Sequence, residues 1–282
     1  MAFTNDRVTC STITLRHLPL PEALEVIASL GFASIDLGAL PGVCDHVPYV
    51  LDDAAVSRVA AQVNASGLSV RSVNADVGDL NSPLPAEGQA ERSTHVDRLL
   101  DLCTAISATA LVLPNGRQQH EPVVDLESDL DLVVSQLTEI SGRARARGIE
   151  LWVEAPHFFR LCFDLERSAE LYSRLPEDVG AVCDVSHIVA SGSTPRQFLE
   201  LFAARTRHVH LRDAEAGYIH HSIGNGTVDF ADLVAALASH GYQGSLALEL
   251  ETRDVENSDR PAAALAAAEY ISELLEGTPS PR

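Results

Sequence analysis

The chain has 282 residues, 46% of them hydrophobic, and its 40 acidic and 20 basic side chains give a net charge of −20. The length is close to the roughly 250 residues of one eight-fold β/α barrel, and the apolar content suffices for a large core. A field of this sign repels DNA, which argues against a nucleic-acid partner. No run of eighteen or more apolar residues occurs, so we expect no membrane span.

The N-terminus and the cysteines together predict a cytoplasmic protein. The first ten residues, MAFTNDRVTC, contain no apolar stretch of the kind found in a signal peptide. The five cysteines are odd in number and show no C-x-x-C spacing, which indicates reduced thiols. The sequence leaves the oligomeric state open, with a homodimer or a homotetramer as the options.

One local pattern recurs along the chain: a helical stretch, a glycine, and then a short β-rich run. It is found at 23–38, 58–75, 139–155 and 231–251. The glycine in each copy sits where the helix should end, because glycine adopts the left-handed conformation that closes a helix. The runs after the glycines are short and apolar, as expected for strands that are buried on both faces.

Filling the gaps between these copies gives eight β/α units in chain order. We expect strands near 8–14, 34–38, 69–75, 109–113, 149–154, 179–184, 207–212 and 245–250. We expect helices near 21–30, 52–66, 90–107, 126–147, 166–175, 195–204, 230–240 and 260–275. Strict alternation predicts a parallel sheet covered by helices. Eight units without a gap favour a single α/β (β/α)₈ TIM barrel over 1–276, rather than an open doubly wound sheet, with a disordered tail at 277–282.

In such barrels the active site lies at the C-terminal ends of the strands. The last four expected strands each carry a carboxylate or an imidazole near that end: Glu154, Asp184, His210 and Glu249. One such residue alone is more often a solvated or helix-capping side chain, but three carboxylates and one imidazole together suit a divalent ion such as Mn²⁺, Mg²⁺, Co²⁺ or Zn²⁺. Spacing leaves Glu251 and His208 as competitors, because residues two apart in a strand face the same side.

These segments resemble the xylose-isomerase-like barrel superfamily, which includes tagatose/psicose 3-epimerases, inosose isomerases and dehydratases, hydroxypyruvate isomerases and endonuclease IV. The resemblance is carried by WVEAPH (152–157), VCDVSH (182–187), HVHLRDA (208–214), IGNGTVDF (223–230) and GYQGSLALE (241–249). In the last of these segments the family pattern selects Glu249 over Glu251 as the ligand.

The resemblance implies a sugar isomerase or epimerase that acts on a ketose, an aldose or an inosose. One divalent ion, most readily Mn²⁺, would be bound by Glu154, Asp184, His210 and Glu249. The two glutamates would also be catalytic, moving a carbon-bound proton through a metal-bound enediolate. His187 and Arg212 would hydrogen-bond substrate oxygens. A sugar or cyclitol dehydratase or lyase is the alternative, because it would use the same enediolate and expel a leaving group.

Other polar residues near the expected strand ends are weaker candidates for contact with a small polyol or sugar. They are His46 after the second strand, Asn74 at the end of the third, Arg117 after the fourth and His157 after the fifth. Their alternative interpretation is an ordinary solvated loop. No phosphate-binding glycine loop is evident, so a phosphorylated substrate is not implied.

An endonuclease IV-like DNA repair enzyme is a remote alternative. HHSIGNG (220–226) resembles a histidine-containing segment of that enzyme, which needs three zinc ions. The matching places for two of the additional ligands hold Asn74 and Tyr218 instead, and the negative charge of the chain opposes DNA binding. The residues therefore favour the sugar enzyme.

Overall fold

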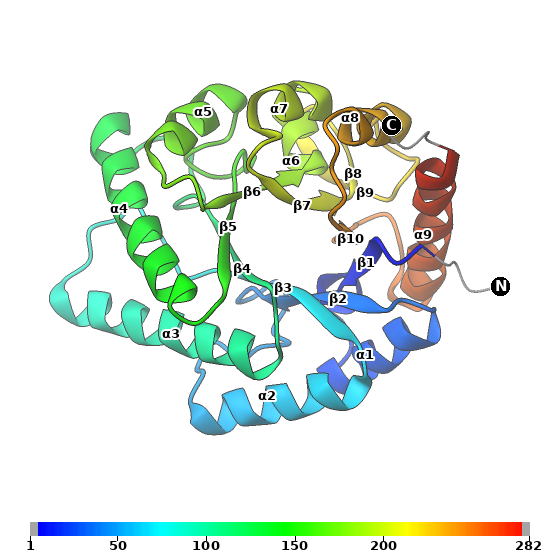
Figure 1. Cartoon of the computed structure of the whole chain (residues 1–282), viewed down its shortest axis with the longest axis horizontal. Coiled ribbons are helices and arrows are strands. Elements are labelled where there is room, and N and C mark those ends of the chain that lie inside the picture. Colours follow the sequence, from blue (N-terminus) through cyan, green and yellow to red (C-terminus); the bar gives the residue numbers. More distant parts are fainter. Residues whose placement is uncertain (1–4, 278–282) are drawn as a thin grey trace.

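Within residues 5–277, which the computed structural model describes, eight parallel strands form a closed barrel (Figure 1). The strands are β1 (Val8–Ser11), β2 (Ser34–Ala39), β3 (Ser69–Ala75), β4 (Ala110–Pro114), β5 (Glu150–Glu154), β6 (Gly180–Asp184), β7 (Thr206–Leu211) and β10 (Leu246–Leu248). They follow chain order around the barrel, and β10 closes the ring by pairing with both β7 and β1. The predicted TIM barrel is confirmed.

The helices that connect the strands surround the barrel, as Figure 1 shows. They are α1 (Leu20–Ser29), α2 (Asp53–Ser66), α3 (Ala86–Ala105), α4 (Leu126–Arg145), α5 (Leu165–Arg174), α7 (Pro195–Phe202), α8 (Phe230–Ser239) and α9 (Arg260–Gly277). Each lies within a few residues of its expected position. Gly277, which we had assigned to the tail, is the last residue of α9, and 278–282 lie outside the described residues.

Several short elements that the sequence analysis did not predict follow the C-terminal ends of barrel strands. They are the 3₁₀ turns η1 (Thr12–Leu15) and η2 (Asn257–Asp259), the helix α6 (Val185–Ala190), and an antiparallel hairpin of β8 (Asp213–Glu215) and β9 (Tyr218–His221). Helix α6 starts directly at the end of β6 because Asp184 caps it. Oδ1 of Asp184 accepts hydrogen bonds from the backbone N–H groups of Ser186 (2.8 Å) and His187 (3.0 Å).

The side chains inside the barrel differ between its two halves. Strands β4, β5 and β6 contribute an apolar cluster of Ala110, Val112, Trp152 and Val182. Strands β2, β3 and β7 instead contribute the buried polar side chains Asp36, Ser72, His208 and His210. Because polar groups are costly to bury without partners, this polar half points to a functional role for the barrel interior.

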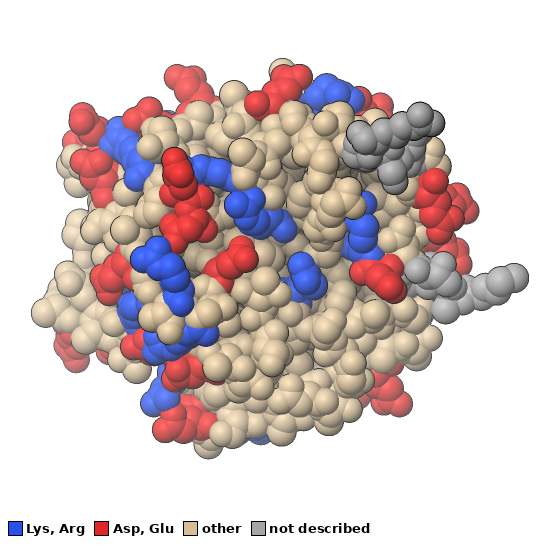
Figure 2. All heavy atoms as spheres, viewed as in Figure 1, with Lys and Arg blue, Asp and Glu red and all other residues tan. Residues whose placement is uncertain are grey.

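The surface carries charged side chains of both signs, and the cysteines are buried and unpaired. On the face shown in Figure 2, acidic and basic side chains are interspersed over the helices. All five cysteines lie in the described part of the chain, where each is buried and unpaired, as predicted. No helix within residues 5–277 is long and apolar enough to cross a membrane.

Candidate metal centre and active site

Four side chains that the sequence analysis selected meet at the C-terminal end of the barrel. Glu154 and Asp184 are the last residues of β5 and β6, His210 lies near the end of β7, and Glu249 directly follows β10. Nδ1 of His210 lies 3.5 Å from Oε2 of Glu154, 3.7 Å from Oδ2 of Asp184 and 3.4 Å from Oε2 of Glu249. All four side chains are buried. Three carboxylates thus surround one imidazole nitrogen.

Each of these carboxylates has one oxygen directed at His210, and in Asp184 and Glu249 the other oxygen accepts a hydrogen bond from a neighbour. In Asp184, Oδ1 caps α6 while Oδ2 faces the imidazole. In Glu249, Oε1 accepts a hydrogen bond of 2.9 Å from the side-chain amide of Asn74. In Glu154, Oε1 lies 3.3 Å from Nε2 of His187. Hydrogen bonds therefore orient the inner oxygens of Asp184 and Glu249 before any ligand arrives.

The inner atoms fit a divalent cation. Among the described residues, neither Oδ2 of Asp184 nor Nδ1 of His210 has a hydrogen-bond partner, although both are buried. Glu154, Asp184 and His210 each offer a ligand atom within 4.8 Å of the other two. An unpaired buried carboxylate oxygen is costly, and a hard or borderline cation is the partner that such oxygens and an imidazole nitrogen prefer.

Without a cation, the centre favours bound protons. Burial raises the pKa of Glu249 to about 8, against the opposing charge of His210. Burial alone would lower the pKa of His210, but the charge of Glu249 and the nearby carboxylate of Asp184 hold it well above its usual value. A cation would have to displace these protons in order to bind.

His187 and His157 form the wall of the site beside Glu154, with ring centroids 3.9 Å apart. Nδ1 of His187 accepts a hydrogen bond of 3.0 Å from the backbone N–H of Phe158. Burial lowers the pKa of His187, which favours the neutral ring. The ring proton of neutral His187 must then sit on Nε2, which faces Glu154, because Nδ1 is the acceptor.

Arg212 is held in place by two neighbours, Ser186 and Glu251. Its Nη2 donates to Oγ of Ser186 at 2.9 Å, and Ser186 in turn donates to Oδ1 of Asp184 at 2.6 Å. Its Nη1 lies 3.4 Å from Oε2 of Glu251, and Oε1 of Glu251 lies 2.6 Å from Nη1 of Arg16. Glu251 is therefore engaged by two arginines, whereas Glu249 is the glutamate that faces His210.

A cavity of about 350 Å³ lies over this centre. Its lining includes six of the residues selected from the sequence: Asn74, Glu154, His157, His187, Arg212 and Glu249. It does not include His46 or Arg117. One ring nitrogen of His46 contacts the carbonyl oxygen of Leu18 at 2.9 Å, and Arg117 donates to the carbonyl oxygen of Glu121 at 3.1 Å. The structure thus gives no support to substrate contact by these two residues, because local backbone groups bind them instead.

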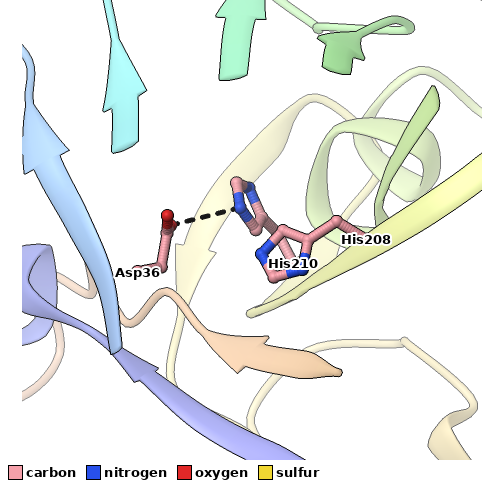
Figure 3. Close-up of side chains that lie close together, drawn as sticks. All are labelled: Asp36, His208 and His210. Carbon is pink, nitrogen blue, oxygen red and sulfur yellow. Dashed lines mark ion pairs between the residues drawn. The ribbon is translucent and has the colours of Figure 1, made fainter. Parts of the chain in front are cut away.

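Asp36 is a residue of the centre that the sequence analysis missed. It lies on β2 inside the barrel, and its Oδ2 is 3.3 Å from Nε2 of His210 (Figure 3). His208 is a close neighbour as well: its ring meets that of His210 edge to face at 4.9 Å and stacks on Trp152 at 5.3 Å. Burial lowers the pKa of His208 to about 3. The sequence signal for Asp36 was a lone carboxylate within an otherwise apolar strand.

The cavity also contains an ion pair from two loop residues. Nη2 of Arg160 lies 2.6 Å from Oδ2 of Asp76, and both residues line the cavity. Arg160 is almost completely buried, so its charge is matched within the protein rather than by solvent. This arginine is therefore already paired within the cavity lining.

Comparison with known proteins finds relatives of similar length and solved structures with a similar fold. A protein of Streptomyces coelicolor with the name "Putative hydroxypyruvate isomerase" is 25% identical over 270 residues, covering 90% of this chain and 94% of that protein. The structure of D-psicose 3-epimerase with D-tagatose from Clostridium cellulolyticum is similar with a TM-score of 0.76 at 16% identity, over 95% of this chain and 99% of that one.

The structure of IOLI protein with a zinc atom is similar with a TM-score of 0.72 at 19% identity, over 96% of this chain and 95% of that one. At these identities the two solved structures establish likeness of fold. A family model described as "Xylose isomerase-like TIM barrel" matches residues 24–274, which is most of the chain. The chain therefore belongs to the xylose isomerase-like TIM barrel family.

Proposed function

We propose that this protein is a metal-dependent isomerase or epimerase of a sugar, a keto-sugar or an inosose. The observation that carries the proposal is the shared orientation of three carboxylates, each with one oxygen directed at Nδ1 of His210. Glu154, Asp184, His210 and Glu249 would hold one divalent ion. The carboxylate-rich set favours Mn²⁺, with Mg²⁺, Co²⁺ and Zn²⁺ as alternatives.

A bound divalent ion would polarise the substrate carbonyl and make the adjacent C–H bond more acidic. Glu154 and Glu249 come from β5 and from the end of β10, which β6 and β7 separate in the ring. They therefore reach a substrate from different directions. One carboxylate takes the proton as the C–H bond breaks, and the same or the other carboxylate returns a proton to carbon. Proton transfer by a placed group of this kind typically contributes about 10²–10⁴-fold.

His187 and Arg212 would bind and orient the substrate. The hydrogen bond between Nδ1 of His187 and the backbone of Phe158 fixes the ring, so that the Nε2–H beside Glu154 would donate to a substrate oxygen placed there. Arg212 offers a charge that Ser186 and Glu251 keep in one place. Fixed donors of this kind stabilise negative charge that develops on an oxygen.

The cavity supports a small polyhydroxylated substrate. Its volume of about 350 Å³ lies at the small end of ligand pockets, and much of its lining is polar. The names of the relatives point the same way, since one is called a hydroxypyruvate isomerase and one structure carries D-tagatose. The five unpaired thiols favour a cytoplasmic location.

The test is a panel of ketoses, aldoses and inososes incubated with the protein and Mn²⁺ in D₂O and followed by NMR. We expect one substrate to incorporate deuterium at a single carbon next to the carbonyl, together with formation of an isomer or epimer. Turnover with loss of water would assign a dehydratase instead. Turnover without solvent deuterium and without a primary isotope effect would overturn proton abstraction in favour of a hydride shift.

A further inference from the structure

Asp36 connects the barrel interior to the candidate metal centre. Its side chain is completely buried. Oδ1 accepts a hydrogen bond of 2.6 Å from the hydroxyl of Ser72 on β3. Oδ2 lies 3.3 Å from Nε2 of His210 (Figure 3). Neither Oδ2 nor Nε2 makes a hydrogen bond within residues 5–277, so each is an unsatisfied polar atom that lies next to the other.

We propose that Asp36 is the positioning residue of the metal centre: its carboxylate accepts the Nε2–H of His210 and so keeps the lone pair of Nδ1 directed at the ion. The inference rests on the proposed function. A neutral imidazole carries its proton on one nitrogen, and the hydrogen bond at that nitrogen decides which one is free to bind metal. A carboxylate in this place also makes the ligand nitrogen more basic.

The surroundings of His210 fix its ring in the orientation that this role needs. His208 packs edge to face against the ring at 4.9 Å with an interplanar angle of 85°. The ring of His208 in turn stacks on Trp152, with ring centroids 5.3 Å apart. His208 fixes the plane of the ring, and a flip of the imidazole within that plane would take Nε2 away from Asp36. Nδ1 therefore stays directed at the three carboxylates.

A purely structural role explains the Asp36 pair less well. A buried ion pair is weak evidence for stability, because apolar residues of similar size usually stabilise a core as well or better. The opposite half of the barrel is filled in that way by Ala110, Val112, Trp152 and Val182. Placing a carboxylate and an imidazole in this half thus calls for a role other than packing.

A second cation between Asp36, His208 and His210 is the competing interpretation. Each of the three offers a ligand atom within 4.8 Å of the others. Such an ion would have to bind Nε2 of His210 while Nδ1 binds the first ion. Neither nitrogen could then carry a proton, and His210 would have to be an imidazolate anion. We therefore expect one ion per chain.

The experiment titrates Mn²⁺ into the metal-free protein and measures affinity and stoichiometry for wild type, Asp36→Asn and Asp36→Ala. Asp129→Asn is the matched control, because Asp129 is another buried carboxylate, held by the side chain of Asn81 at 2.7 Å and away from the cavity lining. We expect one ion in wild type, a Kd raised about 10–100-fold in both Asp36 variants, and no change in the control. Ser72→Ala tests the same link if the Asp36 variants fail to fold, with a Kd raised about fivefold.

A second readout follows the His210 ring proton by NMR in the zinc-loaded protein. We expect a low-field imidazole N–H resonance in wild type and in Asp129→Asn, shifted to higher field in Asp36→Ala. An unchanged Mn²⁺ Kd and an unchanged resonance in the Asp36 variants, with one ion still bound, would overturn the inference about Asp36 alone. Binding of two ions by wild type, with one of them lost in Asp36→Asn, would overturn the inference and indicate a second cation site at Asp36. Absence of any Mn²⁺ binding in wild type would overturn the proposed function, and the inference with it.

Discussion

The side-chain amide of Asn74, at the end of β3, donates a hydrogen bond of 2.9 Å to Oε1 of Glu249, the residue that follows β10. This contact leaves Oε2 of Glu249 directed at His210. In the closed ring, β1 and β2 lie between β10 and β3, so this hydrogen bond depends on closure of the barrel.

Replacing Asn74 with alanine should weaken metal binding. The substitution removes the donor that orients Glu249, and a hydrogen bond to a charged group is typically worth about 1.5–3 kcal/mol. We expect the Kd for Mn²⁺ to rise about 10–100-fold while the far-UV circular dichroism is unchanged. Asn81→Ala is the control, since Asn81 makes a similar bond to Asp129 away from the cavity lining. An equal effect of both variants would contradict a specific role for Asn74.

At least one of the variants Glu154→Gln and Glu249→Gln should lose most of the proton transfer, and both should if one glutamate takes the proton and the other returns it. Glutamine keeps the approximate shape but cannot act as a base, so turnover should fall about 10²–10⁴-fold. Both glutamates are also expected ligands, and the rates must therefore be compared at measured full metal occupancy. If either variant exchanges the substrate C–H with D₂O at the wild-type rate, that glutamate is not the base.

His187→Ala should separate substrate handling from metal binding. His187 contacts Oε1 of Glu154, the oxygen that is turned away from His210. We therefore expect the Mn²⁺ Kd to stay within about threefold of wild type while turnover falls about 10²-fold, the effect of losing one stabilising donor. Metal titration and steady-state kinetics on the same preparation measure both. Loss of the metal in this variant would make His187 a ligand and overturn the assignment.

Metal affinity should increase with pH. In the metal-free protein the pKa of Glu249 is raised to about 8 and that of His210 lies well above its usual value, so both hold protons near neutral pH. A divalent ion would bind the deprotonated forms, and affinity should therefore rise roughly tenfold per pH unit for each proton released, up to about pH 8 for Glu249. Calorimetry in buffers of different ionisation enthalpy measures the protons directly. A flat affinity between about pH 6 and pH 8 would contradict this expectation.

The fold was predictable because each β/α unit carries its own signals. Gly67 ends α2 with a positive φ of 74°, as its place in the sequence pattern indicates. The strands are short apolar runs, and only a barrel or a doubly wound sheet can bury so many of them on both faces. Helix α6 was missed because Asp184 was treated only as a strand end, whereas it is also the N-cap of that helix.

The arrangement of the candidate site was predictable for residues at strand ends and not for residues that meet only through distant contacts. Glu154, Asp184 and Glu249 follow directly from the rule that barrel active sites lie at that end. Asp36 sits inside β2, and only the register across the closed barrel brings it to His210. His46 and Arg117 also follow strands, but their loops turn these side chains toward nearby carbonyl oxygens, which strand position alone does not reveal.

The most direct test of the account is an anomalous difference map from a crystal of the protein grown with Mn²⁺. The account predicts one strong peak per chain, about 2 Å from Oε2 of Glu154, Oδ2 of Asp184, Nδ1 of His210 and Oε2 of Glu249. A peak between Asp36, His208 and Nε2 of His210 instead, or no peak between the three carboxylates at saturating Mn²⁺, would contradict it.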